Sequence, residues 1–105
     1  MTFEELKEFS KEEIVRLEKY FPIPDKQKTI FARITKITEE FGELCKAILS
    51  YYSLQRKDKE QLSKEDVEKE IADTVIGLLL LAEQMDIDVE AALKKKIEII
   101  RSRKY

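Results

Sequence analysis

The scarcity of helix-breaking residues is the feature that most restricts the fold of this chain. Its 105 residues include only two glycines and two prolines, and both prolines fall in one short segment, "FPIPDK". Proline disfavours helix in the residue before it, and glycine weakens helices and strands alike. The long stretches on either side of this segment are therefore free to form helices. Since 40% of the residues are charged, these helices should be strongly solvated, and we expect an all-α fold.

Capping residues divide the chain into four expected helices within one domain, residues 1–105. Thr2, Asp25 and Ser63 each precede a helical pattern and can accept hydrogen bonds from its first turn. Asp86 or Asp88 ends the third helix and caps the fourth. The expected helices cover about residues 3–20, 26–52 and 64–85, and a last stretch that runs to the C-terminus.

Apolar residues in the second and third expected helices predict a four-helix, bundle-like subunit. The second helix carries one stripe with steps of three and four residues, formed by Ile30, Ile34, Ile37, Phe41, Leu44 and Ile48. The third helix contains "VIGLLLLA", which is apolar on every side and needs cover all round. Three neighbouring helices in a small subunit hardly supply that cover. We expect a homo-oligomer, a dimer or a tetramer, with cover by the first helix as the alternative.

Composition excludes several classes of function and of metal site. The net charge is only -2, with acidic and basic residues interspersed, so binding to nucleic acid or to an anionic membrane is not expected. No signal peptide is visible, and the longest apolar run is far too short to cross a bilayer, so we expect a cytoplasmic protein. Without histidine and with one cysteine, the chain lacks the usual zinc ligands. Any metal must be held by oxygen, which favours Mg²⁺ or Mn²⁺.

Two pairs of acidic residues lie inside expected helices and close to their apolar stripes: Glu40 with Glu43, and Glu70 with Asp73. Other acid pairs at this spacing occupy first turns or a helix end, where the helix dipole or water accounts for them. Inside a helix, like charges at this spacing are unfavourable. If the second and third helices pack antiparallel, the two pairs face one cleft, where carboxylates ~5 Å apart repel by roughly 3 kcal/mol at an effective dielectric of ~20. A divalent cation such as Mg²⁺ would remove this repulsion, and its open coordination positions suit a nucleotide polyphosphate.

These residues resemble a known family. "KITEEFGEL" and the later "EKEIADTVIGLLLLAEQMDIDVEAALKKKIEIIRSR" look like the MazG-like, all-α nucleoside triphosphate pyrophosphohydrolases, whose signature is E-x-x-E followed by E-x-x-D. The resemblance covers about residues 26–103. It implies Mg²⁺-dependent cleavage between the α and β phosphates of a nucleoside triphosphate, in a dimer or tetramer that removes noncanonical or excess nucleotides. It also implies that Glu40, Glu43, Glu70 and Asp73 are the metal ligands.

Three further residues receive roles from the resemblance. Glu39 holds a second metal or positions the attacking water, and Lys36 and Lys96 bind substrate phosphates. Each of the three can equally be an ordinary surface residue. Many relatives carry Asn where this chain has Ile100, and some use Trp or His, which are absent here, to recognise the base. The preferred base therefore stays open.

Two other functions remain open from the sequence. Phosphoribosyl-ATP pyrophosphohydrolases share the acid pattern, but they usually carry a His soon after the second acid pair. A noncatalytic helical interaction module would explain "VIGLLLLA" but not the acids beside both apolar stripes.

Overall fold

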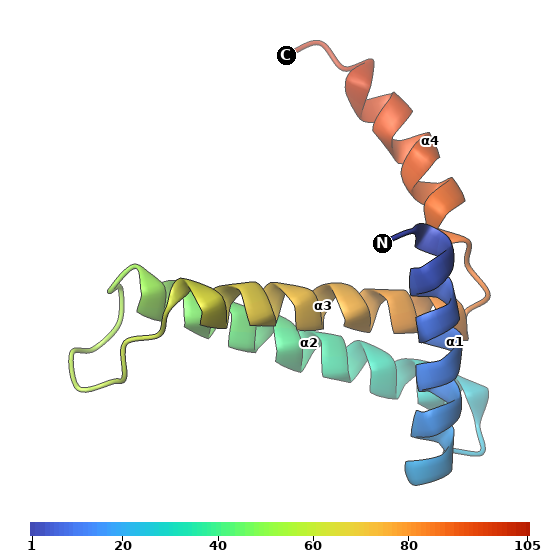
Figure 1. Ribbon diagram of the computed structural model, residues 1–105, viewed down its shortest axis with the longest axis horizontal. Coiled ribbons are helices and arrows are strands. Elements are labelled where there is room, and N and C mark those ends of the chain that lie inside the picture. The colour runs from blue at the N-terminus through green and yellow to red at the C-terminus, as the bar shows by residue number, and fades with distance from the viewer.

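The computed structural model describes all residues from 1 to 105, and it consists of four helices and no strand. This confirms the all-α fold class. The bounds are α1 Phe3–Tyr20, α2 Lys26–Tyr51, α3 Lys64–Gln84 and α4 Val89–Arg101 (Figure 1). None of these helices combines the length and the hydropathy that a membrane crossing requires.

The expected capping residues start the helices. The Asp25 carboxylate accepts hydrogen bonds from the backbone N–H groups of Gln27 and Lys28. Ser63 and Asp66 form a reciprocal capping box, in which each side chain accepts from the other's backbone N–H. Between α3 and α4 both candidate residues contribute, since Asp86 turns the chain with a left-handed φ of 56° and Asp88 caps α4.

Helices α2 and α3 form an antiparallel hairpin, which is the main packed unit of the chain (Figure 1). Their backbones approach closely where Gly77 lies against Ile37: a Cβ at Gly77 would lie 3.1 Å from Ile37 Cγ1. Close helix packing therefore accounts for this glycine. Ala47 is buried at 1% exposure farther along α2. The hairpin thus has the antiparallel arrangement that the acid pairs require.

The loop between α2 and α3 is fastened to the end of α2 by Ser50. The Ser50 hydroxyl donates to the Glu60 carbonyl at 3.0 Å and accepts from the Leu62 N–H at 2.7 Å. Gln61 Nε2 donates to the Ser50 carbonyl. Because Ser50 is 1% exposed, these bonds are shielded from water and fix where the loop returns to start α3.

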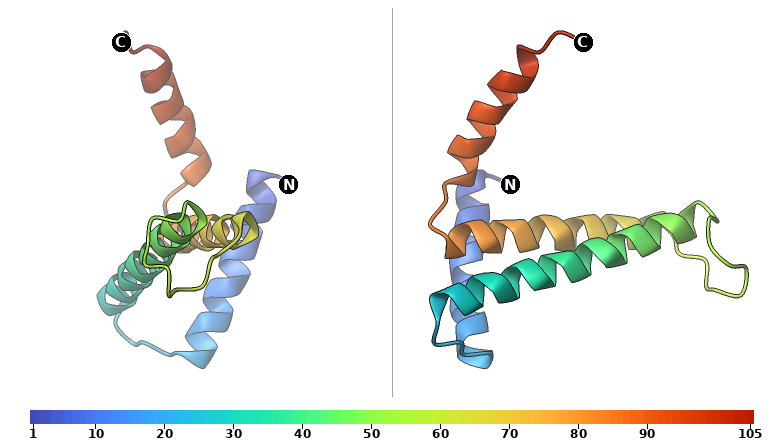
Figure 2. Two further views of the ribbon diagram at one scale, coloured as in Figure 1. Left: turned by 90° about the vertical axis from the view of Figure 1, so that its left-hand side faces the viewer. Right: turned by 180° about the vertical axis from the view of Figure 1, so that it is seen from behind.

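The four helices of the chain do not close into a compact bundle. α1 crosses the C-terminal half of α3, which lies between α1 and α2 (Figure 2, left). There Leu80 is buried at 7% exposure, so α1 covers part of the apolar segment of α3. α4 leaves the end of α3 and points away from the hairpin (Figures 1 and 2). The Cα radius of gyration is consequently 16.8 Å, compared with about 13 Å for a compact domain of this length.

The apolar stripe expected on α2 divides into two parts. Ile37 and Leu44 lie on the side towards α3, whereas Ile34, Phe41 and Ile48 are 43%, 57% and 37% exposed. Glu40 is partly buried and shares the α3-facing side with Ile37 and Leu44. The centre of the packed side is therefore rotated towards Glu40 from the position that the full stripe predicts, because α3 covers only half of it.

Candidate metal centre

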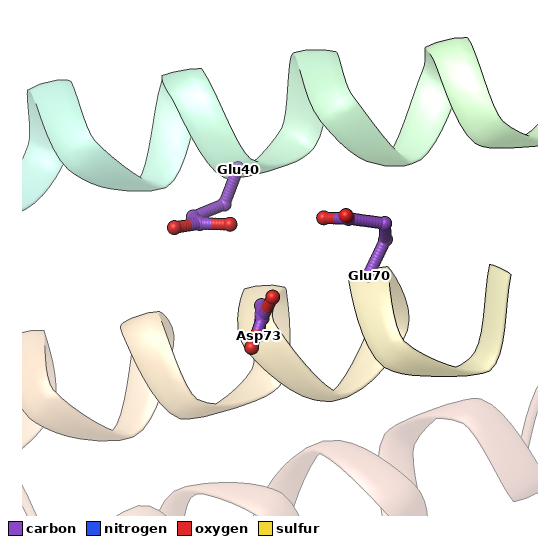
Figure 3. Close-up of side chains that lie close together, drawn as sticks. All are labelled: Glu40, Glu70 and Asp73. Atoms are coloured by element: carbon purple, nitrogen blue, oxygen red, sulfur yellow. The ribbon is translucent and has the colours of Figure 1, made fainter. Parts of the chain in front are cut away.

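Three of the four expected ligands meet between α2 and α3. Glu40 projects from α2, and Glu70 and Asp73 project from α3 towards it (Figure 3). One carboxylate oxygen of each lies within 4.8 Å of the others. The three-residue spacing places Glu70 and Asp73 on neighbouring turns of one helix side, and the antiparallel hairpin brings Glu40 opposite them.

Glu43, the fourth expected ligand, lies at the edge of this cluster. Its side chain is exposed, and its oxygens are not among the three that come within 4.8 Å of one another. It is nevertheless close enough to contribute to the raised pKa of Glu70. Glu43 therefore belongs to the same electrostatic environment without touching the cluster in this rotamer.

The cluster is electrostatically unfavourable without a cation. Desolvation raises the pKa of Glu70 above its ordinary value, and the negative charges of Asp73, Glu40 and Glu43 raise it further, in this order. Each of these effects disfavours the ionised carboxylate. A bound cation would reverse the effect of the neighbouring charges, so the arrangement favours a positively charged ligand.

Lys36, one turn before Glu40, and Glu39, directly before it, form the rim of the cluster. Lys36 Nζ donates to Glu39 Oε1 at 3.0 Å and lies 3.5 Å from Glu40 Oε1. The pKa of Lys36 is raised, chiefly by its hydrogen bond with Glu39 and by that residue's charge. The Lys36 and Glu39 side chains are 53% and 62% exposed, so water screens the lysine charge and it compensates little of the charge inside the cluster. The sequence gives no sign of the Lys36–Glu39 bond beyond the three-residue spacing.

Lys96 does not lie near the acids. It is exposed on α4, which points away from the hairpin (Figure 1). Its role in substrate binding stays a prediction.

A groove of about 320 Å³ lies elsewhere, between the first turns of α1 and the end of α3. It contains none of the expected ligands, and both basic and acidic residues line it.

The donor set suits a hard divalent cation. All three converging groups are carboxylates, and neither nitrogen nor sulfur ligands lie among them. Mg²⁺ and Mn²⁺ prefer such oxygen ligands, and Mg²⁺ usually takes only one or two carboxylates and keeps several waters. Because Asp73 is exposed while Glu40 and Glu70 are partly buried, the cluster opens to solvent on one side, where waters or phosphate oxygens can complete the coordination.

Fold and site together define an all-α protein with an oxygen-lined candidate metal centre. Residues 28–104, most of the chain, match the family model of the MazG nucleotide pyrophosphohydrolase domain. The chain therefore belongs to the MazG nucleotide pyrophosphohydrolase family, as the resemblance of its motifs indicates. The matched range contains the acid cluster, α3 and α4, and almost all of α2, but not α1. No curated protein and no solved structure matches the chain.

Proposed function

We propose that this protein is a Mg²⁺-dependent pyrophosphohydrolase that converts a nucleoside triphosphate, ribo or deoxy, into the monophosphate and pyrophosphate. Its family supports nucleotide pyrophosphohydrolase activity in general. The observation that carries the finer proposal is the convergence of Glu40, Glu70 and Asp73 within 4.8 Å, open to solvent on one side. Removal of noncanonical or excess nucleotides in the cytoplasm is the cellular role that we infer for this activity.

Each polar residue at the site has a part in this reaction. Glu40, Glu70 and Asp73 would hold the metal, and Glu43 would join them after a change of rotamer. A bound Mg²⁺ would supply positive charge against the leaving pyrophosphate and would make water a stronger nucleophile at neutral pH. Glu39, freed from Lys36, orients the attacking water and accepts its proton.

The bond changes balance without any co-reactant. The water oxygen bonds to the α phosphorus, and the bond from that phosphorus to the oxygen bridging the α and β phosphates breaks. The pyrophosphate leaves with the bridging oxygen, and the water's second hydrogen stays on the monophosphate.

Lys36 already lies beside the acids, and its Nζ can exchange Glu39 for a phosphate oxygen when substrate enters. Mn²⁺ can take the same oxygen ligands.

A product assay tests the proposal. The purified protein is incubated with MgCl₂ and a panel of standard and modified nucleoside triphosphates, and the products are separated. We expect monophosphate and pyrophosphate, whereas diphosphate and inorganic phosphate would contradict the assigned bond.

Asp73→Asn and Glu43→Gln should abolish turnover while the fold persists without metal. Glu5→Gln in the first turn of α1 is the control and should retain the parent's activity. Full activity of Asp73→Asn would refute the proposed ligands.

A further inference from the structure

Among the ion pairs of the structure, only the pair of Lys36 with Glu40 involves a proposed metal ligand. Lys36 Nζ lies 3.5 Å from Glu40 Oε1 and donates a hydrogen bond to Glu39 Oε1 at 3.0 Å. We propose that Lys36 takes the place of a cation at Glu40 in the metal-free protein, and that a metal on the acids releases it to bind a substrate phosphate. This inference rests on the proposed function, because it concerns the same metal centre and the same polyphosphate.

Lys36 and a metal would compete for Glu40. Glu40 is the one carboxylate that α2 supplies to the group of three within 4.8 Å. Lys36 precedes it by four residues, so the two side chains lie on one side of α2, one turn apart. A cation on this carboxylate would be a close neighbour of the ammonium group, and like charges at short distance repel. Entry of a metal would therefore break or weaken the ion pair of Lys36 with Glu40.

The Lys36 side chain can move without disturbing the packing of the helices. Both of its ion-pair partners, Glu39 and Glu40, belong to α2 itself, and the lysine side chain is about half exposed. Exposed pairs of this kind contribute little to stability, so the exchange of partners is easily reversed. Asp73 marks the open side of the cluster, where phosphate oxygens are expected. The released ammonium group would lie beside this opening.

The exchange makes metal and phosphate binding cooperative. Without metal, the charge of Lys36 is compensated by two carboxylates, so it opposes metal entry and offers little to a phosphate. With metal, the same charge is free for a phosphate oxygen. Lys36 should therefore weaken binding of metal alone by about two- to fivefold, the value of an exposed ion pair. It should strengthen binding of the polyphosphate to the metal-loaded protein by about tenfold, as a charged hydrogen bond does.

Lys69 is a second lysine near the acids, but it holds none of them. It is exposed and directly precedes Glu70. Desolvation raises the pKa of Glu70, and the charge of Lys69 partly opposes this effect. Lys69 takes part in no ion pair, so it would act on a bound cation only through space, where water screens its charge. Lys69→Gln is therefore the matched control for Lys36→Gln.

Mn²⁺ binding to the full chain without nucleotide tests the competition. Mn²⁺ takes the same oxygen ligands as Mg²⁺, and the electron paramagnetic resonance signal of the free ion reports its concentration. Lys36→Gln should bind Mn²⁺ about two- to fivefold more tightly than the parent, and Lys69→Gln should differ from the parent by less than about twofold. Equal affinity of Lys36→Gln and the parent, or an equal gain in both variants, would overturn the proposal.

Nucleotide binding tests the release of Lys36. The probe is the α,β-methylene deoxynucleoside triphosphate that binds the parent most tightly in Mg²⁺, since this analogue resists cleavage at the assigned bond. In Mg²⁺, calorimetry should show about tenfold weaker binding to Lys36→Gln than to the parent. In chelator, the two proteins should bind it equally weakly or not measurably. Full affinity of Lys36→Gln in Mg²⁺ would overturn the proposal, and so would the same loss in both solutions.

The parent protein separates failure of this inference from failure of the proposed function. A parent that binds neither Mn²⁺ nor any of the analogues would refute both. A parent that binds metal and analogue, and whose Lys36→Gln variant departs from these expectations, would refute only the role of Lys36.

Discussion

Replacement of Glu70 by Gln should stabilise the metal-free protein and weaken its response to Mg²⁺. In the parent, the Glu70 carboxylate faces Glu40 and Asp73, with one oxygen of each within 4.8 Å of the others. Glutamine keeps nearly the same shape but carries no charge. The substitution therefore removes two repulsive contacts and one metal ligand without leaving a cavity.

Coulomb's law gives the size of the effect. At 4.8 Å, two unit charges repel by about 3 kcal/mol at an effective dielectric of ~20 and by about 1 kcal/mol in bulk water. The lower value is closer here because the Glu40 side chain is 20% exposed and Asp73 is exposed. Relief of two contacts should therefore raise the free energy of unfolding by about 1–2 kcal/mol in the presence of a chelator. For a domain of this size each kcal/mol moves Tm by about 4–8 °C.

The stability advantage of the Glu70→Gln variant over the parent should increase as pH rises. Because the pKa of Glu70 is raised in the folded state, the folded protein binds this proton more tightly than the unfolded chain does. The corresponding stability is present below the ordinary pKa of 4.5 and is lost as pH rises through the folded-state pKa. The variant is therefore expected to differ little from the parent near about pH 4 and to exceed it in stability at neutral pH.

Urea denaturation of both proteins at one protein concentration, with and without Mg²⁺, measures these effects. A ligand that binds only the folded state stabilises it by about 2.7 kcal/mol at one hundred times its Kd. The parent should show this gain and the variant much less, so that their order reverses in Mg²⁺. Glu68→Gln, on the exposed side of α3, is the control and should behave like the parent. Lower stability of the Glu70→Gln variant in chelator, or an equal response of both proteins to Mg²⁺, would refute the reasoning.

Two predictions concern the hairpin itself. Ser50→Ala leaves the partly buried Leu62 N–H without its 2.7 Å acceptor, so a loss of about 1–3 kcal/mol is expected in urea denaturation. An unchanged midpoint would contradict this role. Gly42→Ala meets open space and should stabilise α2 by up to about 1 kcal/mol. Gly77→Ala should stabilise the protein less than Gly42→Ala does, or destabilise it, because its Cβ would lie 3.1 Å from Ile37 Cγ1. Equal shifts in Tm for the two alanine variants would count against close packing at Gly77.

Local signals in the sequence predict the helices well, because helix starts depend on residues within one turn. Asp25, Ser63 and Asp88 cap the helices where their positions indicate. The choice between Asp86 and Asp88 depends on the left-handed φ of Asp86, which no short-range pattern specifies. The path of α4 is likewise not encoded in its own periodicity, since an apolar stripe does not say which surface will cover it.

Local spacing in the sequence predicts part of the acid cluster. The spacing of Glu70 and Asp73 fixes their common side of α3, and the antiparallel hairpin then brings Glu40 opposite them. The distance of Glu43 from the other three depends on side-chain rotamers and on how α2 and α3 cross. Its exposure is therefore visible only in the structure. The position of Glu40 on the packed side of α2 is hard to predict because α3 covers only part of the apolar stripe.

The hydrogen bonds of Ser50 with the loop have a consequence for the register of α3 against α2. They lie at the end of the hairpin where the loop joins the two helices, and they set the residue at which α3 begins its return along α2. A slip of α3 by one residue would move Glu70 by about 1.5 Å along the helix axis and about 100° around it, away from Glu40. Additional residues at the outer tip of the loop leave this alignment intact, whereas a change in the spacing between Leu62 and Glu70 does not.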